Sequence, residues 1–398
     1  MFSTTMRLRK VFGQDSWRLA SDRVEAFITR LGGHLGPVTF SLPNGKIQPF
    51  AVAPWSQEGL GPEVPVVLKV LRGDFFCCPF GGNARPWRTE RHPPHGETAN
   101  GIWKLERERH ENGLHSLHLS LRTHIRPGSV EKQILLRDGH GAVYCQHTLR
   151  GMSGPMTVGH HALLRFPGKP GSGRLSTSKF MFGKVCDHFE SPEGGGYSLL
   201  KPGAEFRTLE RVPTITHELV DLSRYPARRG YEELVTLVSD PTLPFAWTAV
   251  TFPEQRYVWF ALKDPAVLRF TMLWQSNGGR HYPPWNGRHV EVMGLEEVTS
   301  YFHYGLAESA GKNPFNQRGL TTCIRLSKKN PTTIRYIMGL QPVPRGFNVV
   351  GEIILRPGQA VLRSRNGKEA AAPIDTDFLR AQSKPSSSGD FILCSGVS

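Results

Sequence analysis

The sequence has 398 residues, of which 38% are hydrophobic, and this is enough to bury a large core. No apolar stretch reaches the length of about 18 residues that a membrane span needs, and no apolar segment follows the basic residues near the N-terminus, as a signal peptide would require. We therefore expect a globular, cytoplasmic protein without a membrane partner.

The formal net charge is +15, from 49 Lys and Arg against 34 Asp and Glu. Such a charge attracts anions at long range, but the basic residues form only short, scattered clusters and accompany no recognisable nucleic-acid-binding motif. We expect no nucleic-acid partner. The charge is instead compatible with an anionic small molecule that is held by Arg side chains.

The six cysteines show no Cys-x-x-Cys spacing and are too sparse for a disulfide scaffold. Cys77 and Cys78 are adjacent, so on a strand their side chains point to opposite faces. They are better explained as two small buried side chains than as metal ligands. We expect no zinc site.

Apolar residues at alternate positions predict a strand with one buried face at 117–125. The next two predicted strands, 130–136 and 142–149, are joined by a turn around Asp138-Gly139, which suits a tight hairpin. Further strands are predicted at 234–238, 247–251, 257–261, 267–274, 323–326 and 349–355.

Helical patterns are few, and 42 Gly and 31 Pro punctuate the chain, which favours short strands joined by turns. We predict a large all-β sandwich in one domain over residues 1–381. Residues 307–331 are expected to form a long surface excursion. The Ser-rich segment 382–398 is expected to be a flexible tail.

Four short motifs follow one another along the chain. They are Gly32-Gly33-His34-Leu35-Gly36, then Cys78-Pro79-Phe80-Gly81-Gly82-Asn83 before His95-Gly96, then Gly159-His160-His161, and finally Gly294-Leu295-Glu296. In type and order they resemble the motifs of the aldose 1-epimerase, or galactose mutarotase-like, superfamily, over residues 24–362. The chain departs from the family pattern where Ala162 replaces an aromatic residue and Glu297 replaces the usual proline. The resemblance implies a twisted β-supersandwich.

The resemblance also implies a reaction, the interconversion of the α and β anomers of an aldose or modified aldose. A base removes the proton of the anomeric hydroxyl while an acid protonates the ring oxygen, and no metal or cofactor is needed. By resemblance Glu296 is the base and His161 the acid, with His160 as the alternative acid, and His95 binds or polarises the substrate. Alternation on a strand brings only one residue of each adjacent pair into a cleft.

A sugar site needs flat apolar surfaces and polar groups for hydroxyls. The segment after the strand at 267–274 offers both, and the segment before His95 offers further polar groups. The candidate substrate-binding residues are Asn83, Arg85, His160, Trp274, Gln275, Arg280 and Trp285. For the residues before His95, stabilisation of irregular backbone is an equally good explanation.

The sequence is also compatible with two other functions. A noncatalytic sugar-binding protein would keep the cleft and lack the chemistry. A glycan lyase or hydrolase is the other option, and hydrolysis normally requires a second carboxylate, for which Glu291 and Glu297 are the sequence neighbours of Glu296. Strand alternation points both of them away from the side that Glu296 faces.

Overall fold

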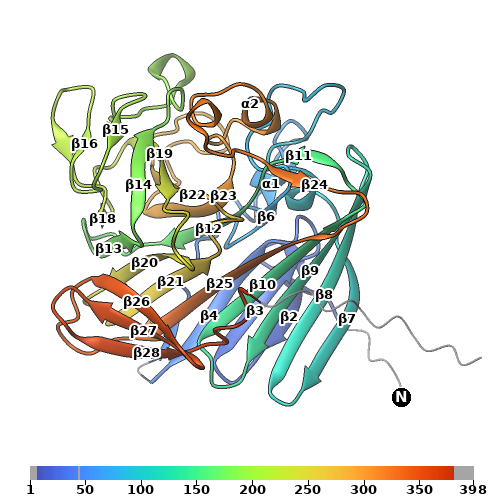
Figure 1. The fold of residues 1–398 in the computed structure, drawn as a ribbon, viewed down its shortest axis with the longest axis vertical. Coiled ribbons are helices and arrows are strands. Elements are labelled where there is room, and N and C mark those ends of the chain that lie inside the picture. The colour runs from blue at the N-terminus through green and yellow to red at the C-terminus, as the bar shows by residue number, and fades with distance from the viewer. Residues whose placement is uncertain (1–6, 44, 381–398) are drawn as a thin grey trace, which may run out of the picture.

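The structure, a computed structural model, describes residues 7–43 and 45–380. Within them the regular secondary structure is almost entirely antiparallel β-sheet, as the alternating pattern predicts (Figure 1). The short helices are α1 (Val66–Lys69) and α2 (Leu306–Ala310), with 3-10 turns η1 (Glu97–Ala99), η2 (Pro192–Gly194) and η3 (Asn316–Arg318). The predicted tail at 382–398 lies outside the described residues.

The largest sheet has nine strands in the order β18-β13-β20-β21-β25-β10-β9-β8-β7. Its strands are β7 (Lys104–Glu111), β8 (Leu114–Thr123), β9 (Gly128–Arg137), β10 (Ala142–Arg150), β13 (Gly173–Thr177), β18 (Arg224–Tyr225), β20 (Ala246–Phe252), β21 (Tyr257–Lys263) and β25 (Thr332–Pro342). The predicted hairpin is confirmed, because β9 and β10 pair with Leu135 opposite Tyr144.

A second sheet has seven strands in the order β15-β14-β19-β22-β23-β12-β6. Its strands are β6 (Phe76–Cys77), β12 (Val158–Arg165), β14 (Phe180–Val185), β15 (Glu205–Phe206), β19 (Tyr231–Ser239), β22 (Phe270–Asn277) and β23 (Val292–Thr299). All but one of the described residues in β12, and every residue in β22 and β23, are buried, so both faces of this sheet are covered.

Smaller sheets complete the fold. Five strands form a meander of β1 (Arg9–Val11), β2 (Gln14–Ala20), β3 (Val24–Thr29), β4 (Leu35–Leu42) and β5 (Gly45–Ile47). Three strands pack near the C-terminal end as β26 (Val350–Arg356), β27 (Gln359–Ser364) and β28 (Glu369–Pro373). Two short pairs join β11 (Gly154–Met156) to β24 (Ile324–Leu326) and β16 (Val212–Pro213) to β17 (Leu219–Val220).

The two large sheets pack face to face over the main hydrophobic core. The ring of His160 on β12 lies 4.4 Å from that of Tyr336 on β25, and Phe76 on β6 stacks at 3.9 Å on His147 of β10. The opposite face of the seven-stranded sheet packs on a second apolar cluster, which includes residues of α1 and Phe315. Cys77 belongs to this second cluster and Cys78 to the main core, so the prediction of opposite faces is confirmed.

A buried ion pair between Lys263 on β21 and Glu297 on β23 ties the two large sheets together, and each side chain is only 1% exposed. The carboxylate also accepts hydrogen bonds of 2.6 Å from the hydroxyls of Thr248 and Thr271. The Lys263 ammonium donates to the Phe270 carbonyl at 2.8 Å. Hydrogen bonds therefore surround both charges and offset much of the cost of removing them from water.

The segment 307–331 lies largely at the surface, as expected of a surface excursion, but it is anchored to the fold. This segment contains most of α2 and all of β24, and Phe315 within it is fully buried. The Phe315 ring stacks at 5.5 Å on Phe270 of the seven-stranded sheet. Apolar residues at 315 and 320 are widely spaced and follow no regular period, so the sequence pattern does not reveal this packing.

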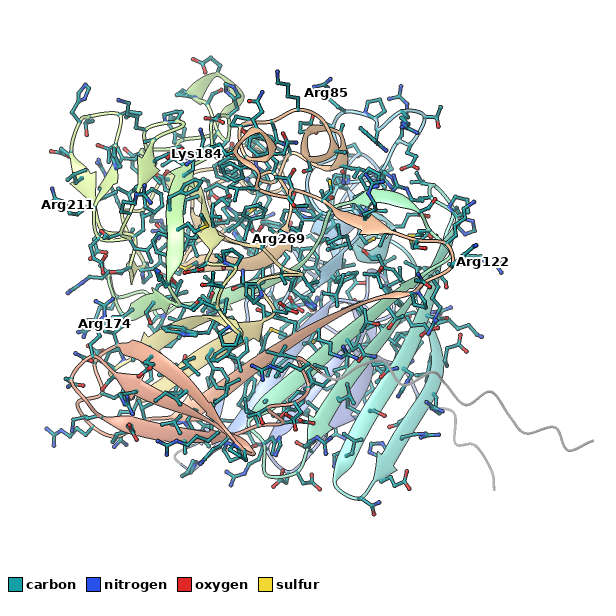
Figure 2. The ribbon with its side chains drawn as sticks, in the orientation of Figure 1. Arg85, Arg122, Arg174, Lys184, Arg211 and Arg269 are labelled. Carbon is teal, nitrogen blue, oxygen red and sulfur yellow. The ribbon has the colours of Figure 1, made fainter. Side chains whose placement is uncertain are left out.

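The basic side chains that Figure 2 labels lie far apart, with Arg85 close to α2, Arg122 at the edge of β8, and Arg174 and Arg211 on the other side of the molecule. The basic charge is thus distributed over several elements. Within the residues that the structure describes, no helix has the length and hydropathy to cross a membrane.

Replacement of Lys263 by Met tests the buried ion pair. We expect Lys263→Met to lower the free energy of unfolding by about 3 kcal/mol, because it leaves the Glu297 carboxylate buried without its countercharge. The same substitution at Lys169, whose pair with Glu254 is exposed, should cost less than about 1 kcal/mol. Urea denaturation of both variants measures the difference, and equal losses would contradict this account.

Candidate active site

A cavity lies on the face of the seven-stranded sheet that α1 covers. Its lining comes from segments that are far apart in the sequence. The lining residues are Val67, Leu68, Leu71, Phe75, His95, His161, Phe189, Leu234, Trp274, Arg280, Trp285, Glu296 and His303. Most of these side chains are apolar, and the polar ones include three histidines, one arginine and one carboxylic acid.

His161 and Glu296 form a pair at the base of this cavity. They are direct cross-strand partners on β12 and β23, and His161 Nε2 lies 3.2 Å from Glu296 Oε1. Cross-strand partners share a face of the sheet, so the register between the two strands brings these side chains together. Their neighbours His160 and Glu297 are paired in the same way on the opposite face.

Burial determines the protonation of this pair. It raises the pKa of Glu296 to about 8, although the nearby Arg280 opposes the rise. Burial also lowers the pKa of His161 well below its ordinary value, and the neighbouring His95 lowers it further. Near neutral pH the two side chains together therefore hold one proton.

His95 approaches the pair from an irregular segment. Its backbone N–H donates to the Gly81 carbonyl at 2.7 Å, and its ring lies 5.1 Å from that of His161 in an edge-to-face arrangement. Gly96 is required beside it, because a Cβ there would lie 2.1 Å from the Cys78 carbonyl oxygen. Burial lowers the pKa of His95 to about 4, so its imidazole is neutral at physiological pH.

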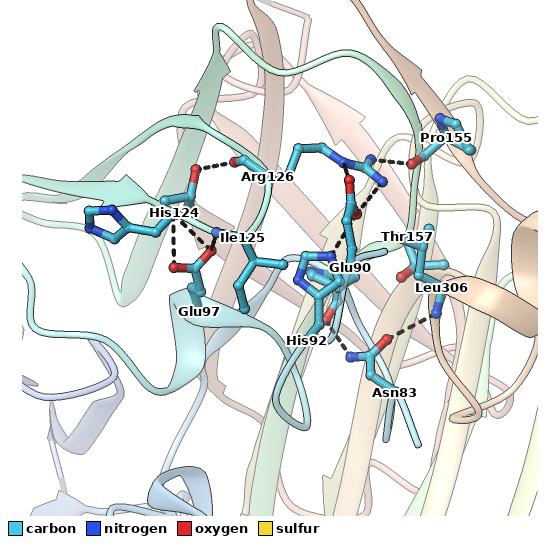
Figure 3. Close-up of polar contacts among 12 residues, drawn as sticks. Asn83, Glu90, His92, Glu97, His124, Ile125, Arg126, Pro155, Thr157 and Leu306 are labelled. Carbon is cyan, nitrogen blue, oxygen red and sulfur yellow. Dashed lines mark hydrogen bonds and ion pairs between the residues drawn. The ribbon is translucent and has the colours of Figure 1, made fainter. Parts of the chain in front are cut away.

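A polar network holds the segment before His95 in place (Figure 3). Arg126 donates two hydrogen bonds to the Glu90 carboxylate, which also bonds the ring of His92 at 2.9 Å. The Asn83 amide donates to the Gly81 carbonyl at 3.0 Å, and its oxygen accepts from the Leu306 N–H at 3.0 Å. Asn83 is thus engaged by backbone groups and does not line the cavity.

Arg280 lies among aromatic rings at the cavity wall. Its guanidinium carbon is 4.5 Å from the centre of the Trp285 ring and 5.0 Å from that of Trp274. Its Nε donates to Glu190 Oε1 at 2.6 Å. Burial raises the pKa of the neighbouring Glu232 to about 7, while Arg280 opposes this rise. The cavity therefore contains a cation that is held against flat aromatic surfaces.

Six of the ten residues that the sequence predicts for the site line the cavity. These are His95, His161, Trp274, Arg280, Trp285 and Glu296. The other four do not line it. They are Asn83, whose amide bonds backbone groups; Arg85, which is exposed and 3.7 Å from Glu308; His160, which bonds Asp74 at 2.8 Å between the sheets; and Gln275, which donates to the Leu222 carbonyl.

The sequence reasoning missed several lining residues. Phe75 stacks on the His161 ring at 4.5 Å, and it lies directly before the Phe76-Cys77 strand, so strand alternation was the available signal. His303 follows the strand of Glu296, and its place on a loop beyond that strand was a weaker signal. The contribution of α1 has no signal in the sequence, because a single helical turn shows no period.

A separate buried group offers metal-ligand atoms between the two sheets. Atoms of Asp74, Cys145 and His160 lie within 4.8 Å of one another. His160 Nδ1 already bonds Asp74, and the ammonium of Lys132 is close enough to Asp74 for their charges to interact. This group lies on the opposite face of β12 from the cavity, so it offers no metal site at the His161–Glu296 pair.

No protein-family model matches the sequence, and no curated protein matches it significantly. Solved structures are similar in fold. A candidate mutarotase from Salmonella typhimurium aligns with a TM-score of 0.56 and 11% identity, over 86% of this chain and 96% of that one. A candidate aldose 1-epimerase from Escherichia coli aligns with a TM-score of 0.55 and 13% identity, over 83% of this chain and 100% of that one.

A galactose mutarotase-like protein from Clostridium acetobutylicum aligns with a TM-score of 0.55 and 12% identity, over 84% of this chain and 98% of that one. The chain has the galactose mutarotase-like fold. Its sheets and core agree with the β-supersandwich that the sequence motifs imply. In this fold, the register of β12 and β23 places the ionisable pair at a largely apolar cavity.

Replacement of Glu296 by Gln tests its raised pKa through stability. Between about pH 5 and about pH 8 the folded chain keeps a proton on Glu296 that the unfolded chain, with a pKa near 4.5, has released. As pH rises through this range, the unfolding free energy of wild type should therefore fall by up to about 1.4 kcal/mol per pH unit relative to that of Glu296→Gln. Urea denaturation across this range measures the difference.

The matched control is Glu254→Gln, because Glu254 is exposed. Its difference from wild type should stay nearly constant with pH. A Glu296→Gln difference that also stays constant would show that Glu296 titrates near its ordinary value.

Proposed function

We propose that this protein is a mutarotase that interconverts the α and β anomers of a small aldose. The single observation that carries the proposal is the contact of 3.2 Å between His161 Nε2 and Glu296 Oε1 at the base of a largely apolar cavity. Two proton-exchanging groups in contact can serve two oxygens of one substrate, and the anomeric hydroxyl and ring oxygen of an aldose are bonded to the same carbon. The fold similarity supports the same class.

The pair begins the reaction with one proton. Transfer of that proton from Glu296 to His161 Nε2 makes a carboxylate and an imidazolium, and the pair as a whole stays uncharged. Glu296 then takes the proton of the anomeric hydroxyl while His161 gives its proton to the ring oxygen. The bond from the anomeric carbon to the ring oxygen breaks, the aldehyde rotates, and the reverse transfers close the ring on the other face and restore the pair.

The other lining residues supply binding. Trp274 and Trp285 line the cavity and add apolar surface beside Arg280 for the C–H groups of a sugar. The Arg280 guanidinium, whose Nε bonds Glu190, has its remaining N–H groups available as donors to sugar oxygens. Neutral His95, edge-on to His161, is placed to bond the substrate beside the reacting oxygens.

Hydrolysis of a glycan is less well supported. It normally requires two carboxylates around the scissile bond. Of the described residues that line the cavity, Glu296 is the one carboxylic acid, and Glu297 faces the other side of the sheet in its pair with Lys263. A noncatalytic sugar-binding protein is the other alternative, and the experiment below distinguishes it from a mutarotase.

That experiment is anomeric exchange followed by NMR on a panel of neutral and acidic aldoses. We expect wild type to accelerate exchange, and Glu296→Gln to lower kcat about 10²- to 10⁴-fold while staying folded, because it removes a general base. Glu254→Gln is the matched control and should keep full activity. Full activity of Glu296→Gln would remove Glu296 from the base role, and sugar-dependent protein shifts without acceleration would favour the binding protein.

The pH profile should report the shared proton. We expect kcat/KM to fall as pH rises through about 8, because the pair then loses the proton that protonates the ring oxygen. Spontaneous exchange, measured without protein at each pH, is subtracted. An activity that instead rises to a plateau above about pH 8 would mean that ionised Glu296 alone limits the rate.

A further inference from the structure

One wall of the cavity is aliphatic. It is formed by Val67 and Leu68 of α1 and by Leu71 just after it. Val67 is 2% exposed and Leu71 is 3% exposed, so these side chains are held rigidly in the second apolar cluster. They can contact a ligand only through methyl and methylene groups.

The backbone of this wall has no spare donors either. The Val67 N–H donates to Asn100 Oδ1 at 2.8 Å, the Leu68 N–H to the Pro65 carbonyl at 3.0 Å, and the Leu71 N–H to the Leu68 carbonyl at 3.4 Å. The Leu68 carbonyl also accepts from Trp55 Nε1 at 2.7 Å. A hydroxyl that is pressed against this wall would find no N–H donor there.

The polar groups belong to other segments. Apart from the reacting pair, they are His95, His303 and Arg280. Burial lowers the pKa of His303 to about 3, so it is neutral like His95. The cavity therefore combines polar groups beside the reacting pair with a wall that has only apolar side chains and no spare N–H donor, and it suits a ligand that is itself polar on one side and apolar on another.

We propose that the substrate is a deoxy aldose, with a methyl group where the common hexose carries a hydroxymethyl group, and that this methyl group packs on Val67, Leu68 and Leu71. This inference rests on the proposed mutarotase function. A buried hydroxyl without a partner is costly, whereas a methyl group in the same place gains contact with the wall. One such hydroxyl should cost about tenfold or more in kcat/KM.

Matched sugar pairs that differ in this one hydroxyl test the inference: D-galactose with D-fucose, D-glucose with 6-deoxy-D-glucose, and L-mannose with L-rhamnose. NMR exchange on wild type should show about a tenfold or greater preference for the deoxy member of at least one pair. Equal rates, or faster exchange of the hydroxymethyl sugar in every pair, would overturn the substrate class while leaving the proposed function in place. Acceleration of no sugar would remove the function and this inference with it.

A single added hydroxyl in the wall provides the second test. Val67→Thr keeps the size of the side chain and offers the missing partner, so the deoxy preference should shrink at least about threefold. Val66→Thr makes the same change one residue earlier, at a half-buried position that does not line the cavity, and should leave the preference unchanged. An unchanged preference in Val67→Thr, or an equal change in Val66→Thr, would overturn the placement of the methyl group.

Discussion

The pairing of β12 with β23 is the constraint on which the site depends. In this register His161 faces Glu296 and His160 faces Glu297, and a shift of β12 by one residue would turn His161 to the opposite face and break its pairing with Glu296. Because the sheet is covered on both sides, each face gives its pair a different environment. The structure thus buries four ionisable side chains on two adjacent strands, with one pair at the cavity and the other between the two large sheets.

The two environments explain the different properties of the pairs. Between the sheets, Glu297 is compensated by Lys263 and two threonine hydroxyls, and His160 bonds Asp74. On the cavity side, the close polar partner of Glu296 is His161, which is neutral and provides no countercharge. Burial therefore raises the pKa of Glu296 to about 8. A carboxyl group that loses its proton near physiological pH suits proton exchange. The burial that raises its pKa also lowers the free energy of unfolding as pH rises.

Apolar packing connects the chemistry to substrate choice. Phe75 stacks on His161, and the tryptophans around Arg280 belong to the same cluster as the α1 wall. This cluster surrounds the His161–Glu296 pair and leaves few polar groups for a ligand. The same apolar packing that would shift the pKa values of the acid and base would therefore also favour a less hydroxylated sugar.

The sequence by itself determined many of the strands and the β9–β10 hairpin, because alternation and turn residues are local signals, and the order of its motifs made His161 and Glu296 candidates for the site. It could not separate His160 from His161 or assign Asn83 and Gln275 a place, since the direction of a side chain depends on which strand lies beside it. The tertiary structure decided these questions. It also brought α1, Phe75 and His303 to the cavity, because contacts between distant segments leave no periodic trace in the sequence.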